Sequence, residues 1–163
     1  MAFDYQRVVR FGDTDAAGVM YFASTFNFCH EAYEASLAAS TINLEQFFSR
    51  LGVAVPIVHA EASYFQPLRC GESVQVCLVP RQDSDTSFSI AYTLYVRSLD
   101  GSPPNQPTLD LTHPDQQNPH LPIAGGGDRL VGKASTKHVA IDPELQRKVA
   151  LPPELRGWLK RWG

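Results

Sequence analysis

The chain is poor in cysteine and in charge, and it has no long apolar run. Its three cysteines, Cys29, Cys70 and Cys77, are an odd number without zinc-site spacing, so the sequence indicates neither a disulfide framework nor a cysteine-bound metal. No apolar run approaches the ~20 residues that span a bilayer, and the first residues lack the apolar core of a signal peptide. We therefore expect a cytoplasmic protein without a membrane span.

The low charge also argues against nucleic acid as a partner. Charged residues make up 19% of the chain and the formal net charge is −3, whereas nucleic-acid-binding domains usually carry a basic patch. Apolar residues make up 44%, an ordinary proportion for a globular protein. A length of 163 residues fits a single domain over residues 1–163.

Two acids precede the main helical pattern of the chain. A strand-like segment, residues 3–11, is followed by Asp13 and Asp15 and by a turn of small residues that ends at Gly18. A helical pattern then begins near Tyr21. The first amides of a helix lack intrahelical partners and favour negative charge. This order therefore places a carboxylate beside backbone amides that can bind a developing anion.

The spacing of apolar residues predicts the helices. Phe22, Phe26, Cys29, Tyr33 and Leu37 follow one another at intervals of four, three, four and four, which makes one apolar stripe on a helix over residues 22–40. A shorter helix is expected over 43–51, with Asn43 as a possible cap, and an amphipathic helix over 152–162 that packs Leu155, Trp158 and Leu159 on the body.

From Val53 onwards the apolar period changes to two. Strands are expected over residues 53–65, 73–81, 87–98 and 129–141, because alternation is typical of half-buried strands. Residues 99–128 are rich in Pro, Asn, Gln and Gly and indicate an irregular loop insertion. The fold class is therefore α+β, with one long helix packed on a curved antiparallel sheet of about five strands.

The motif that joins strand and helix resembles that of the hotdog-fold thioesterases, in the 4-hydroxybenzoyl-CoA thioesterase branch. It reads Phe11-Gly12-Asp13-Thr14-Asp15-Ala16-Ala17-Gly18-Val19-Met20-Tyr21-Phe22. The strand-to-strand corner around Tyr64, Pro67 and Gly71 is a weaker match. The helix text from Cys29 to Glu34 is most similar to cyanobacterial 1,4-dihydroxy-2-naphthoyl-CoA thioesterases, which implies a hydrolase of phylloquinone biosynthesis that needs no cofactor or metal.

The resemblance also implies roles for individual residues. Asp15 is expected to be the nucleophile or general base, and the backbone amides of Tyr21 and Phe22 are expected to polarise the thioester carbonyl. Substrate contacts are expected from Gly18, Val19 and His59, the last on the strand that lines the pocket in the family. Asp13 is expected to be a structural turn acid, and six cations are candidates to bind the CoA phosphates: Arg69, Arg81, Arg97, Arg129, Lys133 and Lys137.

Other readings of these residues stay open. One related sub-branch has a histidine where this chain has Phe22, so histidine-assisted attack from that position is excluded. Glu31 or Glu34 on the helix could serve as the base, as in another hotdog clade, although a His30–Glu34 pair is the simpler account. The alternatives at the level of function are a broader acyl-CoA or acyl-carrier-protein thioesterase, a hotdog dehydratase and a non-catalytic CoA-binding module.

A single helix on one sheet leaves the other face and an edge strand uncovered. Hotdog domains solve this by pairing edge to edge into one continuous sheet. The resemblance therefore implies a homodimer at minimum, commonly paired into a tetramer, with Asp15 of one subunit facing strand residues of the other.

Overall fold

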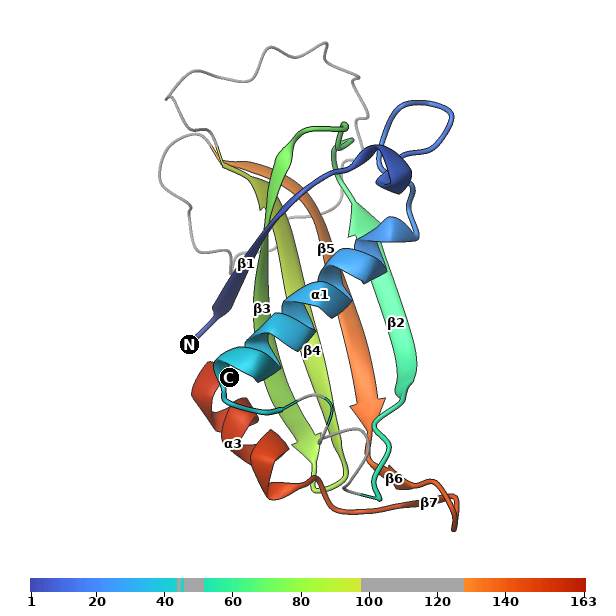
Figure 1. Ribbon diagram of the computed structural model, residues 1–163, viewed down its shortest axis with the longest axis vertical. Coiled ribbons are helices and arrows are strands. Elements are labelled where there is room, and N and C mark those ends of the chain that lie inside the picture. The colour runs from blue at the N-terminus through green and yellow to red at the C-terminus, as the bar shows by residue number, and fades with distance from the viewer. Residues whose placement is uncertain (44, 46–51, 98–127) are drawn as a thin grey trace, which may run out of the picture.

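A long helix lies across one face of an antiparallel sheet in the computed structural model of the protein (Figure 1). The structure describes residues 1–43, 45, 52–97 and 128–163. The strands of the main sheet are β1 (Phe3–Val8), β2 (Ile57–Tyr64), β3 (Ser73–Ser84), β4 (Ser87–Val96) and β5 (Arg129–Val139). The other elements are the short 3-10 helix η1 (Phe11–Asp13), helices α1 (Ser24–Ala39) and α3 (Pro153–Trp162), and the small strands β6 (Ile141–Asp142) and β7 (Arg147–Lys148).

The main sheet has the strand order β1-β3-β4-β5-β2, and all its neighbours are antiparallel. β1 and β2 are therefore its two edges. The register brings Val76 of β3 opposite Leu94 of β4, and Tyr92 of β4 opposite Ala134 of β5. The α+β class with about five strands, predicted from the sequence, is confirmed.

The core lies between the sheet and α1. Every second residue of β4 from Phe88 to Leu94 is at most 2% exposed, because alternate side chains of a strand point to the same face. Helix α1 adds Phe28, Ala32 and Leu37, all fully buried. On the opposite face of β4, Ala91 is exposed and Ser89, Thr93 and Tyr95 are half-buried.

The predicted apolar stripe of the long helix is wrong at its N-terminal end. Phe22 precedes α1 and is 60% exposed, and Phe26 is only half-buried. The chain turns at residues 21–23 before the helix starts at Ser24, so the buried face keeps Cys29, Tyr33 and Leu37 of the predicted stripe and loses Phe22 and Phe26. It consists of Ser24, Thr25, Phe28, Cys29, Ala32, Tyr33, Ser36 and Leu37.

The C-terminal helix packs as the sequence predicts. Leu155, Trp158 and Leu159 are all buried, and the indole Nε1 of Trp158 donates a hydrogen bond to Ser36 Oγ at 2.9 Å. These contacts fix α3 against the C-terminal half of α1. The strand predicted over 53–65 starts only at Ile57, while the helix predicted over 43–51 and the loop insertion over 99–128 fall almost wholly outside the described residues.

Candidate active site at the start of helix α1

A cavity of about 370 Å³ opens where the chain enters α1. The start of α1 lies beside the end of β2 in Figure 1, and segments of both border the cavity. Its floor comes from β4 and β5. The lining residues are Asp15, Val19, Met20, Tyr21, Phe22, Thr25, Ser63, Tyr64, Phe65, Gln66, Pro67, Leu68, Leu94, Val131 and Gly132.

Asp15 is held at the tip of a tight loop. Its N–H donates to the Val19 carbonyl at 2.9 Å, and its carbonyl accepts the Gly18 N–H at 3.0 Å. Gly18 has φ +75°, a conformation that glycine adopts without a steric cost. Asp15 Oδ1 accepts the Ala17 N–H at 2.8 Å, and within the described residues Oδ2 has no partner. The side chain is exposed and borders the cavity, so one carboxylate oxygen is available for chemistry.

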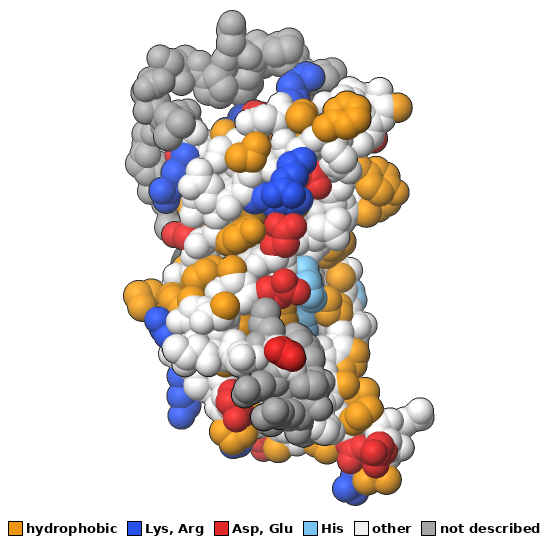
Figure 2. All heavy atoms as spheres, viewed as in Figure 1, with side chains coloured by type: hydrophobic (Ala, Val, Ile, Leu, Met, Phe, Trp, Pro, Cys, Tyr) orange, Lys and Arg blue, Asp and Glu red, His pale blue; other side chains and the backbone are white. Residues whose placement is uncertain are grey.

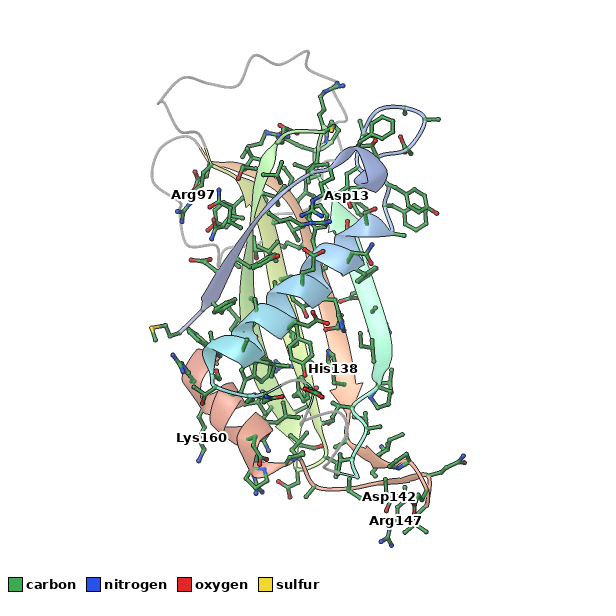
Figure 3. The ribbon with its side chains drawn as sticks, viewed as in Figure 1. Asp13, Arg97, His138, Asp142, Arg147 and Lys160 are labelled. Atoms are coloured by element: carbon green, nitrogen blue, oxygen red, sulfur yellow. The ribbon has the colours of Figure 1, made fainter. Side chains whose placement is uncertain are left out.

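Asp13 has a different environment, although it lies only two residues earlier. It is 8% exposed, and its carboxylate accepts the Arg10 N–H at 2.8 Å and pairs with Arg7 at 3.2 Å. Arg7 also pairs with Glu31 at 3.1 Å and stacks on the Phe28 ring. Figure 3 shows Asp13 beside the start of α1. A buried, fully paired acid fits the structural role expected for Asp13.

The two backbone amides expected to bind the oxyanion differ in availability. The Tyr21 N–H donates to the Asp13 carbonyl at 2.8 Å, so the expectation that it is free needs correction. In the described part of the chain the amides of Phe22 and Ala23 have no acceptor, because both precede the first full turn of α1. The Phe22 amide stays a prediction, and the Ala23 amide joins it.

His59 lies outside this cavity in a single chain. It is exposed on β2, with Nε2 3.7 Å from a carboxylate oxygen of Glu61. The strand reaches the cavity only at its end, through Ser63 and Tyr64. Val19 lines the cavity, whereas Gly18 is not among the lining residues and lies in the turn that carries Asp15; contact of either residue with a substrate stays a prediction.

Several cavity residues carry no signal in the local sequence. The Tyr64 hydroxyl donates to the Phe22 carbonyl at 2.9 Å and ties the end of β2 to the start of α1. Gly132 allows close strand contact, since a Cβ there would lie 2.9 Å from the Ser63 carbonyl oxygen. The aromatic pair Tyr64 and Phe65 precedes Pro67 in the corner that resembles the family, but the local sequence does not show that it reaches the start of α1.

Ion pairs and burial show which charged and titratable side chains are not available for catalysis or substrate binding. Arg129 forms an ion pair with Glu72 and donates to the Pro67 carbonyl at 2.9 Å, so its guanidinium is already engaged in structural contacts. Burial raises the pKa of the Cys29 thiol to about 12, which removes it as a nucleophile. Burial also lowers the pKa of His138 to about 4, and Figure 3 places His138 toward the other end of the sheet from Asp13.

The described residues form neither a metal site nor a membrane-spanning helix. No cluster of three or more His, Cys, Asp or Glu side chains in that part of the chain could hold a metal ion. Likewise, no helix within residues 1–43, 45, 52–97 and 128–163 is long and apolar enough to cross a membrane.

The sequence model of the Thioesterase-like superfamily matches residues 9–159, and the chain belongs to this family. Among curated relatives, the 1,4-dihydroxy-2-naphthoyl-CoA hydrolase of Rippkaea orientalis is 41% identical over 157 residues, covering 96% of this chain and 94% of the relative. The enzyme of the same name from Crocosphaera subtropica is 38% identical over 156 residues, with the same two coverages.

A solved structure supports the fold. The 1,4-dihydroxy-2-naphthoyl-CoA thioesterase from Synechocystis superposes with a TM-score of 0.76 at 28% identity, covering 98% of this chain and 96% of the other. The resemblance to hotdog-fold thioesterases drawn from the Asp13–Phe22 motif is therefore confirmed.

Proposed function

We propose that this chain hydrolyses 1,4-dihydroxy-2-naphthoyl-CoA to 1,4-dihydroxy-2-naphthoate and CoA, as a step of phylloquinone biosynthesis. The observation that carries the proposal is the exposed Asp15 carboxylate at an apolar cavity that also borders the start of α1. The names of relatives that match over almost the whole chain support the acyl group.

The chemistry needs an oxyanion site and a carboxylate. In our proposal the thioester carbonyl oxygen accepts hydrogen bonds from the amides of Phe22 and Ala23. These bonds strengthen as the carbonyl carbon becomes tetrahedral, and one such donor lowers a barrier by about 3 kcal/mol. Because the donors belong to the backbone at the start of a helix, they need no reorganisation during the reaction.

Asp15 can act as a nucleophile or as a general base, and each route accounts for every bond and proton. As a nucleophile, its carboxylate oxygen bonds to the carbonyl carbon and the C–S bond breaks, which leaves an acyl-aspartyl anhydride that water then hydrolyses. As a general base, it takes a proton from a water molecule that attacks the carbon directly. In either route the CoA thiolate leaves and is protonated.

The cavity wall suits a flat aromatic acyl group. Its lining includes the exposed Phe22, Tyr64 and Phe65 and the buried Leu94 and Val131. Aromatic side chains bind rings by edge and face contacts at little entropic cost. Arg69 adjoins the cavity residue Leu68 and is exposed, which makes it our candidate to meet a CoA phosphate.

The edge strand β2 supports a homodimer as the working unit. Ile57 is 45% and Val58 56% exposed, and the outer edge of β2 has no strand partner within the described residues. Figure 2 shows hydrophobic side chains gathered along the side of the molecule where β2 runs. We propose that two copies join there into one sheet and that dimers pair into tetramers, in the cytoplasm, where three unpaired thiols are stable.

Hydrolysis can be followed as release of free CoA thiol. The substrates are 1,4-dihydroxy-2-naphthoyl-CoA, benzoyl-CoA, a fatty acyl-CoA and an acyl-carrier protein. We expect the first to have the highest kcat/KM, and we expect Asp15→Asn to lower its kcat by about 10²-fold or more. Asp142→Asn is the matched control, because Asp142 also caps a turn through its carboxylate and lies far from Asp13 in Figure 3.

Each other outcome has a distinct meaning. Near-normal hydrolysis by Asp15→Asn contradicts the mechanism. A preference for fatty acyl chains or for the carrier protein contradicts the naphthoyl substrate and favours the broader thioesterase. CoA-ester binding without hydrolysis by the wild type would point to a CoA-binding module. Incorporation of ¹⁸O into Asp15 during a single turnover in labelled water identifies the nucleophilic route.

A further inference from the structure

A buried hydroxyl group borders the cavity without a hydrogen-bond partner. Thr25, in the first turn of α1, is 3% exposed and lines the cavity. Its Oγ1 is inaccessible and has no partner within the described residues. Threonine in a helix usually donates to the carbonyl three or four residues earlier, so the missing bond requires an explanation.

The two carbonyls within reach of Thr25 each accept at least one other hydrogen bond, and neither accepts the Thr25 hydroxyl. The Tyr21 carbonyl accepts the Ser24 N–H at 2.9 Å. The Phe22 carbonyl accepts the Thr25 N–H at 3.3 Å and the Tyr64 hydroxyl at 2.9 Å. By contrast, the hydroxyl of Ser36 on the same helix donates to the Tyr33 carbonyl at 2.7 Å. The local backbone therefore does not satisfy Thr25.

No other group among the described residues bonds the Thr25 hydroxyl. Leu94 and Val131, which line the same cavity, are apolar. Two further buried polar atoms within the described residues lack partners, on Arg7 and His138, and neither residue lines the cavity. A buried hydroxyl without a partner costs free energy, and a valine of the same shape would avoid that cost. A ligand with a matching polar group would recover it.

We infer that the Thr25 side chain rotates about its Cα–Cβ bond, turns its buried hydroxyl toward the cavity, binds a ring hydroxyl of the acyl group and so selects hydroxylated aryl thioesters; this rests on the proposed thioesterase function. Thr25 lies one 3-10-type turn after Phe22, whose carbonyl accepts the Thr25 N–H at 3.3 Å, and such a turn rises about 6 Å, roughly the size of one aromatic ring. A carbonyl at the Phe22 amide therefore places the ring beside Thr25.

The geometry of the acyl group selects one of its hydroxyls. A hydroxyl ortho to the thioester, such as the 1-hydroxyl of 1,4-dihydroxy-2-naphthoyl-CoA, can donate internally to the thioester carbonyl. The 4-hydroxyl is meta to the thioester and has no internal partner. It can donate to Thr25 Oγ1 or accept from it, so this pair completes the bonding of both groups.

The test compares 3-hydroxybenzoyl-CoA with benzoyl-CoA, which differ by one meta hydroxyl. The measured quantity is the ratio of their kcat/KM values. We expect the wild type to favour the hydroxylated ester by about 10- to 100-fold, since sites built to bond a hydroxyl discriminate against its absence. Thr25→Val should bring the ratio to about one, and Thr25→Ser should largely retain the preference.

Two controls keep the result specific. Thr93→Val makes the same change on the opposite face of β4, outside the cavity-lining residues, and should leave the ratio unchanged. Thermal unfolding should show Thr25→Val to be at least as stable as the wild type, because the variant loses an unpaired polar group. A wild-type ratio near one, or equal losses for both esters in Thr25→Val, would overturn the inference.

Binding separates this inference from the proposed function. In the Asp15→Asn background the Kd of each ester can be measured without turnover. If the wild type hydrolyses neither ester but binding still favours 3-hydroxybenzoyl-CoA through Thr25, hydrolysis fails and the recognition by Thr25 stands. If hydrolysis proceeds and Thr25→Val changes neither ratio nor Kd, the recognition fails and the hydrolase stands.

Discussion

Asp13 and Asp15 should respond in opposite ways to the same substitution by asparagine. The change removes a negative charge and keeps the shape of the side chain. Asp13 is buried and bonded to Arg7 and to the Arg10 amide, whereas Asp15 is exposed with one hydrogen bond from Ala17. We therefore expect Asp13→Asn to lower stability and Asp15→Asn to lower activity.

The magnitudes follow from these contacts. Removing one partner of a buried ion pair costs about 3–5 kcal/mol. Arg7 keeps Glu31 at 3.1 Å, and asparagine still accepts one hydrogen bond, so we expect about 2–3 kcal/mol for Asp13→Asn, a fall in Tm of roughly 4–12 °C for a chain of this size. In Asp15→Asn the amide oxygen still accepts from Ala17, so the change in stability should stay below about 0.5 kcal/mol.

The two substitutions should affect activity in the opposite order to stability. Loss of a catalytic carboxylate should lower kcat by about 10²- to 10⁴-fold in Asp15→Asn. Folded Asp13→Asn, assayed well below its melting temperature, should keep kcat within about threefold, since its carboxylate does not border the cavity. Thermal unfolding at one fixed protein concentration and thiol release at one temperature measure both quantities, because assembly couples stability to concentration. Inactive but stable Asp13→Asn, or active Asp15→Asn, would refute this assignment of roles.

Three further changes test the fold around the site. Ser36→Ala removes the acceptor of the Trp158 indole N–H, and urea unfolding should show a loss of about 1–3 kcal/mol; no change would mean that this bond does not hold α3. Burial lowers the pKa of His138 to about 4, so between about pH 6.5 and 4 the unfolded chain binds the extra proton. Stability should be full above pH 6.5 and fall by about 3 kcal/mol as the pH drops to 4, a slope that His138→Gln should remove in urea titrations at several pH values. Gly132→Ala places a Cβ 2.9 Å from the Ser63 carbonyl, so both Tm and kcat/KM should fall; an unchanged Tm would show that β2 adjusts freely.

The elements of the fold could be predicted because their signals are local. Alternation over 87–98 predicted β4, and its alternate residues from Phe88 to Leu94 are buried. The stripe of α1 was shifted because the exposed Phe22 has the right spacing for a helix that has not yet begun. Hydrophobic spacing does not show that the chain turns at residues 21–23 first.

The site could be predicted only in part. Asp15 was visible because motif and turn are contiguous in sequence. Tyr64 and Gly132 were not, since the order β4-β5-β2 brings them to the start of α1 from distant segments. The occupied amide of Tyr21 depends on a bond to the Asp13 carbonyl, and no residue type signals a backbone contact of this kind.

The edge position of β2 also sets the order in which the molecule assembles. β3 and β4 are joined by a turn of two residues and can pair early, because closing a short loop costs little chain entropy. β2 bonds only β5, with Tyr64 opposite Gly132, and must close a far longer loop to do so. Refolding should therefore restore the β3–β4 hairpin first and enzymatic activity last, and before two copies pair along β2 the amides of β2 should exchange with solvent before those of β4.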